Sequence, residues 1–480
     1  MAAPSRLPRT FAALHAVALL AVAPIAACNF PRPADVAGEA GPSDASLPTD
    51  AAPDGLPIDG QLVDAAPDAP DLPGTAIHVS PTGDDANDGF TMPVKTLKHA
   101  IGLAAANSDI IHIVLASGRY SAATGETFPY TVPLNVTVIG PAGGGATLAG
   151  TKAEPGMSLN GSGLQDVDLA DFTTAITATG TATLKNIRVL TSAVGLQAET
   201  TARVMSSSLE IAGTAGACAK GVILIGSAQF TGAVFTTRNL ATTMEARDHS
   251  VSNVANANIS GDKGCSQSLA LFRVTSDASF ALSDSLLDGG PRSGVLLNPP
   301  VAGFSATISS TTIRNMKLDA IGGGAPVGGS MTFHMTGGEL SNNENIGVEL
   351  GDGTWTFTNV TIRQNLGSAV YLQNAHLIMR GCMITGNRSG IDVFDNATAD
   401  LGTASSPGNN LLQGNTEVGL VLDGGAAGAS LVNAVGNTWN PDKQGTDHDG
   451  HYPMTDTVSI PVPFVSGNNF AINSGWSLSR

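Results

Sequence analysis

The stretch from Val348 to Asn387 contains one sequence unit written twice, with the copies 22 residues apart. The matched positions are Val348 and Val370, Leu350 and Leu372, Trp355 and Leu377, Phe357 and Met379, Val360 and Cys382, Ile362 and Ile384, and Asn365 and Asn387. A short unit that recurs in tandem is typical of a solenoid, in which each copy forms one coil and packs against its neighbours. This repeat constrains the fold more than any other feature of the chain.

Within each copy, apolar and polar residues alternate in two short runs that are separated by a skip of two residues. Alternation with a period of two predicts strands, and the skip predicts a corner. The runs are rich in Thr, Val, Ile, Gly and Asn, which argues against helical repeats. A coil cannot bury its inward residues alone, so coils must stack with strands about 4.8 Å apart. We therefore predict an all-β, single-stranded parallel β-helix, right-handed because parallel crossovers are right-handed.

The same pattern of four inward positions continues through nine consecutive units, at spacings of roughly 20 to 28 residues. The seven units before the founding pair are Ala182-Leu184-Ile187-Val189, Val204-Ser206-Leu209-Ile211, Ala228-Phe230-Ala233-Phe235, Ser252-Val254-Ala257-Ile259, Phe280-Leu282-Ser285-Leu287, Ala306-Ile308-Thr311-Ile313 and Phe333-Met335-Gly338-Leu340. Turns of unequal length explain the variable spacing.

Residues 1–28 have the features of an export signal: two arginines, an apolar run from Phe11, and small residues before Cys28. This ending resembles a bacterial lipobox, which implies cleavage before Cys28 and acylation of its thiol. The alternative is an ordinary signal peptide with a chance cysteine. Because the next residue is Asn29 and not an aspartate, the resemblance to lipoprotein sorting rules favours the outer membrane or cell surface of a Gram-negative bacterium.

Residues 29–75 contain nine prolines, nine acidic residues, one arginine and one aromatic residue, Phe30. Such a segment cannot bury enough apolar surface to offset its ordering entropy, so we predict a disordered, partly extended tether. One arginine and nine acids give the tether a charge of −8, within a net charge of −17 for the whole chain. The rest of the chain is also acidic and has no basic run, which argues against nucleic acid as a partner.

Residues 76–480 form the predicted β-helix domain. We expect an N-terminal cap over residues 76–109, coils over about 110–440, and a closing segment over 441–480. An amphipathic helix near Val94 to Ile101 is placed to cover the open end of the solenoid. The loop from Gly83 to Gly89 has a calcium-like composition but no EF-hand register, so we interpret it as a turn. We expect a monomer.

Several short motifs at the two ends of this domain resemble secreted bacterial β-helix proteins of the pectin-lyase-like superfamily, and more narrowly an uncharacterised domain-of-unknown-function branch of it. The opening motifs are Val79-Ser80-Pro81-Thr82-Gly83, Asn87-Asp88-Gly89, Lys95-Thr96-Leu97 and Gly118-Arg119-Tyr120, and the closing ones are Ser406-Pro407-Gly408-Asn409-Asn410 and Gly436-Asn437-Thr438-Trp439-Asn440-Pro441. The resemblance implies the fold and leaves the chemistry open. The hydrolase branch's Asn-Thr-Asp and Gly-His-Gly motifs are missing from the coils.

Three cysteines remain after Cys28. Cys382 occupies an inward position of the pattern, which predicts a buried free thiol. Cys218 and Cys265 each lie four residues before a strand, in coils separated by one intervening coil. Equivalent points two coils apart are about 9.6 Å from each other, too far for a disulfide. Both turns are long enough to bulge over the intervening coil, so we predict a bridge between them.

Asn343, Asn365, Asn387 and Asn415 each fall three residues after the last inward apolar residue of a coil. Stacked amides at one turn can hydrogen-bond along the axis and tolerate left-handed geometry. We interpret them as a structural ladder.

Acidic residues also stack on the outward side of the founding repeat. Glu349 and Asp392 flank Tyr371 and are the weak catalytic candidates. Three residues further on, Asp352, Asn374 and Asp395 form a weak metal-binding candidate, because carboxylates on adjacent coils can share one ion. Calcium is the only cofactor that this pattern suggests. A solvated acidic face is the simpler interpretation of both columns.

Two functions remain open. The first is a non-catalytic surface lipoprotein that serves as a scaffold or binds a glycan or another envelope protein. The alternative is a polysaccharide lyase or glycoside hydrolase that acts from the acidic outward face. We favour the first, because no Lys or Arg stands beside Glu349 to Asp395 as a base.

Overall fold

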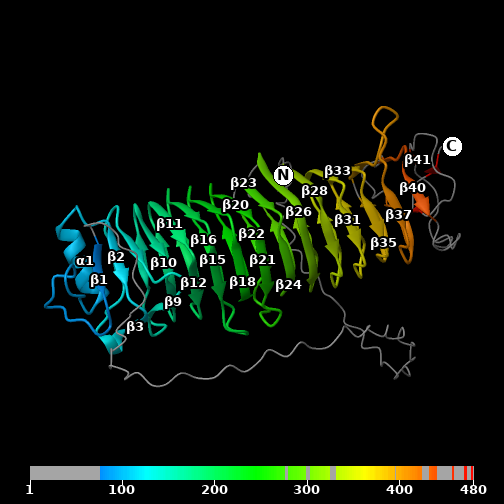
Figure 1. Ribbon diagram of the computed structural model, residues 1–480. Coiled ribbons are helices and arrows are strands. Elements are labelled where there is room, and N and C mark those ends of the chain that lie inside the picture. The colour runs from blue at the N-terminus through cyan, green and yellow to red at the C-terminus, as the bar shows by residue number, and fades with distance from the viewer. Residues whose placement is uncertain are drawn as a thin grey trace, which may run out of the picture. The chain divides into compact units, whose positions relative to one another are not determined.

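The structure is a computed structural model that describes residues 76–275, 279–298, 303–324, 331–394, 396–423 and 432–440, together with three short strands beyond them. Nearly all of the regular structure is parallel strand, and each coil contributes a strand to each of three faces. Successive coils lie side by side along one axis, with α1 (Leu97–Ala106) at the N-terminal end (Figure 1). The prediction of a parallel β-helix solenoid is confirmed.

Face A is the first row of strands and pairs in parallel from coil to coil. Its strands are β1 (Ala76–Val79), β2 (His112–Leu115), β5 (Thr137–Ile139), β8 (Ser162–Gln165), β11 (Thr181–Lys185), β14 (Arg203–Ser206), β17 (Gln229–Gly232), β20 (Val251–Ala255), β23 (Ser279–Ser283), β30 (Gly353–Thr358), β33 (Ala375–Arg380), β36 (Thr398–Asp400) and β39 (Val432–Asn433). Stacking therefore begins at β1, earlier than the predicted start of the coils near residue 110.

Face B follows face A after a corner in each coil. Its strands are β3 (Gly118–Ser121), β6 (Ala146–Ala149), β9 (Asp168–Ala170), β12 (Ile187–Leu190), β15 (Leu209–Ala212), β18 (Phe235–Leu240), β21 (Ala257–Gly261), β24 (Leu286–Gly290), β31 (Thr361–Arg363), β34 (Met383–Thr385), β37 (Leu411–Gln413) and β40 (Thr438–Asn440). Two long strands, β26 (Phe304–Met316) and β28 (Met331–Ser341), pass through the corner and belong to both faces.

Face C is a separate sheet of parallel strands. Its strands are β4 (Tyr130–Val132), β7 (Met157–Leu159), β10 (Thr174–Ala178), β13 (Val194–Ala198), β16 (Lys220–Leu224), β19 (Thr242–Ala246), β22 (Ala270–Val274), β25 (Ser293–Leu297), β27 (Ile321–Gly323), β29 (Val348–Leu350), β32 (Val370–Gln373), β35 (Ser389–Phe394), β38 (Val418–Asp423) and β42 (Phe470–Ile472). Two further short strands, β41 (Thr457–Val458) and β43 (Ser477–Leu478), pair with each other.

The founding repeat has the register that its 22-residue spacing predicts. Val348 pairs with Val370 on face C, and Trp355 pairs with Leu377 on face A. Trp355 and Phe357 are completely buried in the core that runs along the solenoid axis. The predicted inward face of this repeat is therefore confirmed.

One predicted unit is wrong by two residues. The four positions given as Ala228-Phe230-Ala233-Phe235 are occupied by Phe230, Gly232, Phe235 and Thr237, because Val204 pairs with Phe230 and Leu209 with Phe235. Ala228, Phe230 and Phe235 are still buried, since strand side chains alternate with a period of two, but Ala233 falls in the corner and is exposed.

The predicted corner between faces A and B contains a residue in the left-handed region. Asp166, Asn186, Asn256 and Asn359 have φ angles of 55°, 53°, 49° and 55° there. Asn and Asp tolerate this region because their short polar side chains hydrogen-bond locally. The corner composition therefore follows from backbone geometry.

The asparagine ladder is confirmed. The Asn343 Nδ2 donates to Asn365 Oδ1 at 2.7 Å, and the Asn365 Nδ2 donates to Asn387 Oδ1 at 2.9 Å. The Asn387 Nδ2 continues the ladder to Asn415 Oδ1 at 3.2 Å. All four side chains are buried. The ladder therefore links each of these coils to the next through a buried hydrogen bond.

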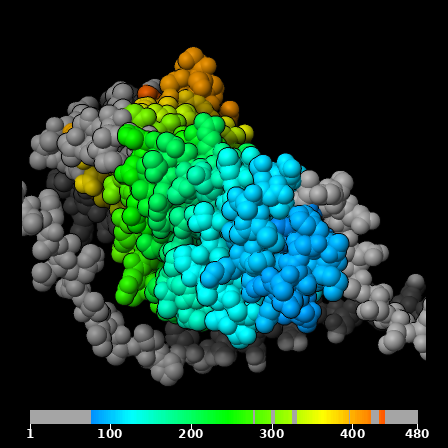
Figure 2. Space-filling view, turned by 90° about the vertical axis from the view of Figure 1, so that its left-hand side faces the viewer, coloured from blue at the N-terminus to red at the C-terminus, as the bar shows by residue number. Residues whose placement is uncertain are grey.

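A short cap covers the N-terminal end of the coils, where Figure 2 shows the first residues lying over the coils behind them. Glu126 is buried against the start of α1, and its Oε1 accepts a hydrogen bond from the Leu97 N–H at 2.8 Å. The aspartates of the loop from Gly83 to Gly89 also accept hydrogen bonds from backbone N–H groups. Asp85 accepts from the Lys95 and Thr96 N–H groups, and Asp88 accepts from the Phe90 N–H. That loop is a turn, as interpreted from the sequence.

The structure contains a disulfide between Cys218 and Cys265, whose Cα atoms are 5.4 Å apart. The two cysteines precede β16 and β22, and β19 lies between these strands. The Gly216 N–H also donates to Asp262 at 2.7 Å, so the two turns meet over the intervening coil. Cys382 is a buried free thiol, and burial raises its pKa to about 11.

The signal segment with Cys28, the tether, Asp395, and most of the closing segment with His448 and Asp449 lie outside the described residues. Among the helices that the structure describes, none is long and apolar enough to cross a membrane.

Candidate functional site

A continuous row of outward side chains crosses seven successive coils of face C. We call this row the face C strip, and its members are Glu245, Arg273, Leu296, Gly322, Glu349, Tyr371 and Asp392. Each pairs in register with the next, so the side chains follow one another at the coil spacing of about 4.8 Å. The founding repeat supplies only Glu349 and Tyr371, and Asp392 lies on the coil that follows it.

The N-terminal end of the strip carries a cluster of cations around one acid. Glu245 is almost fully buried and pairs with Lys220 at 2.9 Å, Arg247 at 3.0 Å and Arg273 at 3.0 Å. Burial tends to raise the pKa of Glu245, but hydrogen bonds from Arg247 and Lys220 outweigh it and hold the pKa below its usual value. Three cations around one carboxylate leave an excess of positive charge at this end.

The middle of the face C strip has no large projecting side chain. Leu296 is partly buried, and Gly322 on the next coil has no side chain. A Cβ added at Gly322 would lie 3.8 Å from the nearest atom of Leu296 and 3.9 Å from Asp319 Oδ2. The open position therefore lies directly beside a carboxylate.

That carboxylate belongs to a pair. Asp319, on the turn before β27, is buried, and its side chain is hydrogen-bonded to that of Glu349 on the following coil. Its Oδ1 also accepts from Asn345 Nδ2 at 2.9 Å and from the Ile346 N–H at 3.1 Å. Burial, together with the negative charge of Glu349, raises the pKa of Asp319 to about 6. Asp319 therefore holds its proton up to about pH 6, where it can donate that proton to the Glu349 carboxylate.

The C-terminal end of the strip combines an aromatic ring with a second buried acid. Tyr371 stacks on Phe394 with ring centroids 4.9 Å apart. Asp392 is only 8% exposed, and burial raises its pKa to about 6 although the Ser368 hydroxyl donates to its Oδ2. Within the described residues, Asp392 Oδ1 has no hydrogen-bond partner. An unsatisfied buried acceptor is rare in native structures, which sets Asp392 apart from the other acids of the strip.

The predicted catalytic candidates, Glu349 and Asp392, do lie in one column on either side of Tyr371. Their environments differ, because Glu349 is exposed and Asp392 is buried. The predicted uniform, solvated acidic face is thus replaced by one exposed and one desolvated carboxyl.

The first two members of the second predicted column do follow one another, because Asp352 precedes Gly353, which pairs with Ala375, and Asn374 precedes Ala375. The third member, Asp395, lies outside the described residues. The Asn396 Nδ2 donates to Asn374 Oδ1 at 3.2 Å and occupies the oxygen that a cation would need. The described part of the chain contains no cluster of three or more His, Cys, Asp or Glu side chains that could hold a metal. The predicted calcium site, which includes Asp395, therefore stays a prediction.

Asp319 and the cation cluster were missed in the sequence. Ile321 precedes Val348 by 27 residues, the same spacing that separates Ala306 from Phe333. Extending the repeat backwards by that spacing would have found Gly322 beneath Glu349. Asp319 itself lies on a turn, outside the alternating pattern.

Comparison with solved structures found β-helix proteins that act on polysaccharides. The Azotobacter vinelandii mannuronan C-5 epimerase AlgE4 A-module is 13% identical, with a TM-score of 0.34, over 79% of this chain and 94% of that one. The catalytic domain of a GH87 alpha-1,3-glucanase in complex with nigerose is 12% identical, with a TM-score of 0.35, over 84% and 70%. The periplasmic alginate epimerase AlgG is 10% identical, with a TM-score of 0.31, over 80% and 89%. No curated protein matches the chain.

Two family models match different parts of the solenoid. Residues 81–268 match the model described as "Protein of unknown function (DUF1565)", and residues 293–440 match "Right handed beta helix region". Together with the three parallel faces, these matches bear out the resemblance noted in the sequence and establish the hand of the helix.

Proposed function

We propose that this chain, a right-handed parallel β-helix, is an exported lipoprotein that binds a polysaccharide along face C and does not cleave it. The single observation that carries the proposal is the unbroken register of the face C strip. A linear glycan laid along the helix axis would meet new side chains at each coil.

The chemistry of the strip suits such a ligand. The carboxylates of Glu349 and Asp392 accept hydrogen bonds from hydroxyl groups, and the half-buried ring of Tyr371 offers an apolar surface with a polar tip. Gly322 places no side chain between the cationic end and the acid pair. A few placed polar groups on a largely fixed surface are typical of ligand sites.

Cleavage is the second candidate, and the raised pKa values of Asp319 and Asp392, both about 6, are what favour it. The spacing of the carboxyl groups argues against cleavage. Glycosidases hold their two carboxyl groups about 5–5.5 Å or about 6.5–9.5 Å apart, to admit the sugar or a water. Asp319 and Glu349 are directly hydrogen-bonded, which leaves no such room. Glu349 and Asp392, two coils apart at about 9.6 Å, have Tyr371 between them.

The proposed location in the cell rests on the sequence. The export signal and Cys28 support a lipid anchor, and the tether of residues 29–75 supports a flexible link between anchor and β-helix. Together they favour the outer membrane or cell surface of a Gram-negative bacterium.

The test is a glycan array followed by calorimetry with the best-bound oligosaccharide. Tyr371→Ala and Gly322→Trp should each weaken binding at least about tenfold, the latter by placing a bulky side chain where an added Cβ would meet no atom closer than 3.8 Å. Glu344→Gln changes an exposed acid on the same coil as Glu349 but outside the strip and should leave the affinity unchanged. Absence of any bound glycan, or release of new reducing ends, would show that the proposed function is wrong.

A further inference from the structure

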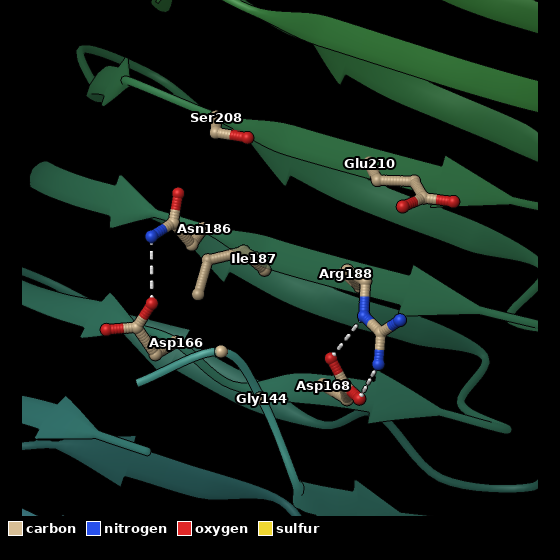
Figure 3. A pocket seen from close by; sticks show the side chains of 9 residues that line it. Gly144, Asp166, Asp168, Asn186, Ile187, Arg188, Ser208 and Glu210 are labelled. Carbon is tan, nitrogen blue, oxygen red and sulfur yellow. Dashed lines mark hydrogen bonds and ion pairs between the residues drawn. The ribbon is translucent and has the colours of Figure 1, made fainter. Parts of the chain in front are cut away.

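Face B carries a hollow of about 270 Å³ near the N-terminal end of the solenoid. It lies where β9, β12 and β15 follow one another on adjacent coils, with the loop around Gly144 opposite them (Figure 3). It is therefore on a different face from the face C strip, and on coils nearer the cap.

The floor of the hollow is held in place by buried acids. Asp168 is 5% exposed and pairs side-on with Arg188, whose Nε donates to Asp168 Oδ1 at 2.8 Å. Asp166 is 8% exposed and accepts from Asn186 Nδ2 at 2.8 Å and from Gln165 Nε2 at 2.9 Å. These bonds orient Arg188 and Asn186 from below and leave their outer atoms facing the hollow (Figure 3).

Several polar atoms at the rim remain available. Asn186 Oδ1 and the Ser208 hydroxyl have no hydrogen-bond partner among the described residues, and Glu210 binds Arg238 through Oε1 only. Arg188 uses Nε and Nη2 for Asp168, which leaves the Nη1 donors. Acceptors and donors thus alternate around the hollow on three successive coils.

The opposite wall has no side chains to fill the space. Gly143 and Gly144 have φ angles of 85° and 95°, which L side chains rarely adopt. A Cβ at Gly144 would approach Arg188 Nη2 to 3.9 Å, and nothing lies within 4 Å of one at Gly143. Elsewhere on face B, the pairs Arg314 with Asp288 and Arg363 with Glu339 have the same chemistry. The glycine loop distinguishes this pair from those.

The size and charge of the hollow indicate the kind of ligand. Its volume is below the roughly 300–1,000 Å³ of sites for drug-sized molecules, which suits a single ring. Asp166, Asp168 and Glu210 outnumber Arg188, so an anion would be repelled. A hydroxyl group both donates and accepts, which matches the alternating atoms at the rim. We propose that this hollow binds one neutral sugar residue, independently of face C.

The experiment is ligand-observed NMR and calorimetry on the whole folded chain with a panel of methyl hexopyranosides, and with glucuronate as the anionic comparison. One neutral hexoside should bind, and Ser208→Ala and Glu210→Gln should each weaken it about threefold to tenfold, as loss of one hydrogen bond predicts. Both side chains are partly exposed, so both variants should fold.

Glu339→Gln is the matched control, because Glu339 stands in the same column of face B as Glu210 and also pairs with an arginine. It and Glu349→Gln on face C should leave hexoside binding unchanged. If a disaccharide binds as well as the hexoside, the site is assigned to the end of a glycan. If the disaccharide binds more weakly, the site is assigned to a free sugar. Absence of hexoside binding at millimolar concentration, equal binding by all variants, or tighter binding of glucuronate overturns the proposal.

Discussion

The side chains of Asp319 and Glu349 are hydrogen-bonded carboxyl groups on adjacent coils of the same face. Two carboxylates on face B of neighbouring coils pair with an arginine, Asp288 with Arg314 and Glu339 with Arg363. The Asp319 pair instead depends on a shared proton, so its contribution to stability must change with pH.

A carboxyl group whose folded-state pKa lies above its unfolded value adds stability at low pH and loses it as the pH rises through the folded value. Burial and Glu349 raise the pKa of Asp319 from 3.8 to about 6. We expect Asp319→Asn to gain about 2–3 kcal/mol relative to the wild type between pH 4 and pH 8. Denaturant unfolding at both pH values measures this difference. Glu344→Gln is the control, and a difference that does not vary with pH contradicts the shared proton.

Phe357 is fully buried, with its ring centroid 5.6 Å from that of Phe333 on the preceding coil. Phe357→Ala should lower the free energy of unfolding by about 3–5 kcal/mol, because the cavity cannot collapse between stacked strands. Thr356→Ala, on the outward side of the same strand, should cost less than about 0.5 kcal/mol. Equal losses in the two variants would mean that the inward assignment is wrong.

Asn365 stands inside the amide ladder, where its Oδ1 accepts from Asn343 and its Nδ2 donates to Asn387. Asn365→Ala leaves both neighbours with unpaired buried groups, each of which costs about 1–3 kcal/mol. Hydrogen exchange should speed up in the coils on both sides of residue 365. Leu366→Ala removes an exposed side chain next to it and should change neither exchange nor stability.

The cysteines should differ in reactivity. Burial raises the pKa of Cys382 to about 11, so a maleimide at pH 7 should label it only after unfolding. Closing a chain segment with a sequence separation of 47 residues should make the Cys218–Cys265 bridge worth about 4 kcal/mol in the chain-entropy model. Peptide mapping without reductant, and unfolding of the Cys218→Ser, Cys265→Ser double variant, test both statements. Labelling of Cys382 in the folded protein would show that the thiol is accessible.

Cys28 is predicted to carry lipid. The mature protein should partition into detergent and incorporate labelled fatty acid, and Cys28→Ala should release it from the membrane because the acyl chains supply the membrane affinity. Membrane association that survives this substitution would contradict the anchor.

The sequence predicts the solenoid well because one signal, the alternation of inward residues, is repeated in many coils. Val348 with Val370 and Trp355 with Leu377 pair as their spacing requires. The same alternation explains the error at Ala228, which is also fully buried, because a slip of two residues leaves the alternation within a strand unchanged and moves only the corner.

The site was harder to predict, because its residues come from places that the alternation does not describe. Asp319 lies on a turn, and the segment from Phe394 to Thr398 is one residue longer than the segment from Gln373 to His376 with which it pairs. The pKa of Asp392 depends on its burial and on its neighbours Ser368 and Arg388, which the sequence pattern does not reveal. A repeat predicts the face on which a residue lies and the order of the coils. It does not predict how deeply a carboxyl group is buried or whether two carboxyl groups share a proton.

The bridge between Cys218 and Cys265 spans two coil interfaces at once, since β19 lies between the strands that follow the two cysteines. Coils of a solenoid touch only their neighbours, so a pull along the axis would part them one interface after another. A covalent link across two interfaces carries the load past the middle coil. Coils that are pulled away one by one from the C-terminal end would therefore release no chain between Cys218 and Cys265, because the tension passes through the disulfide and not through that segment.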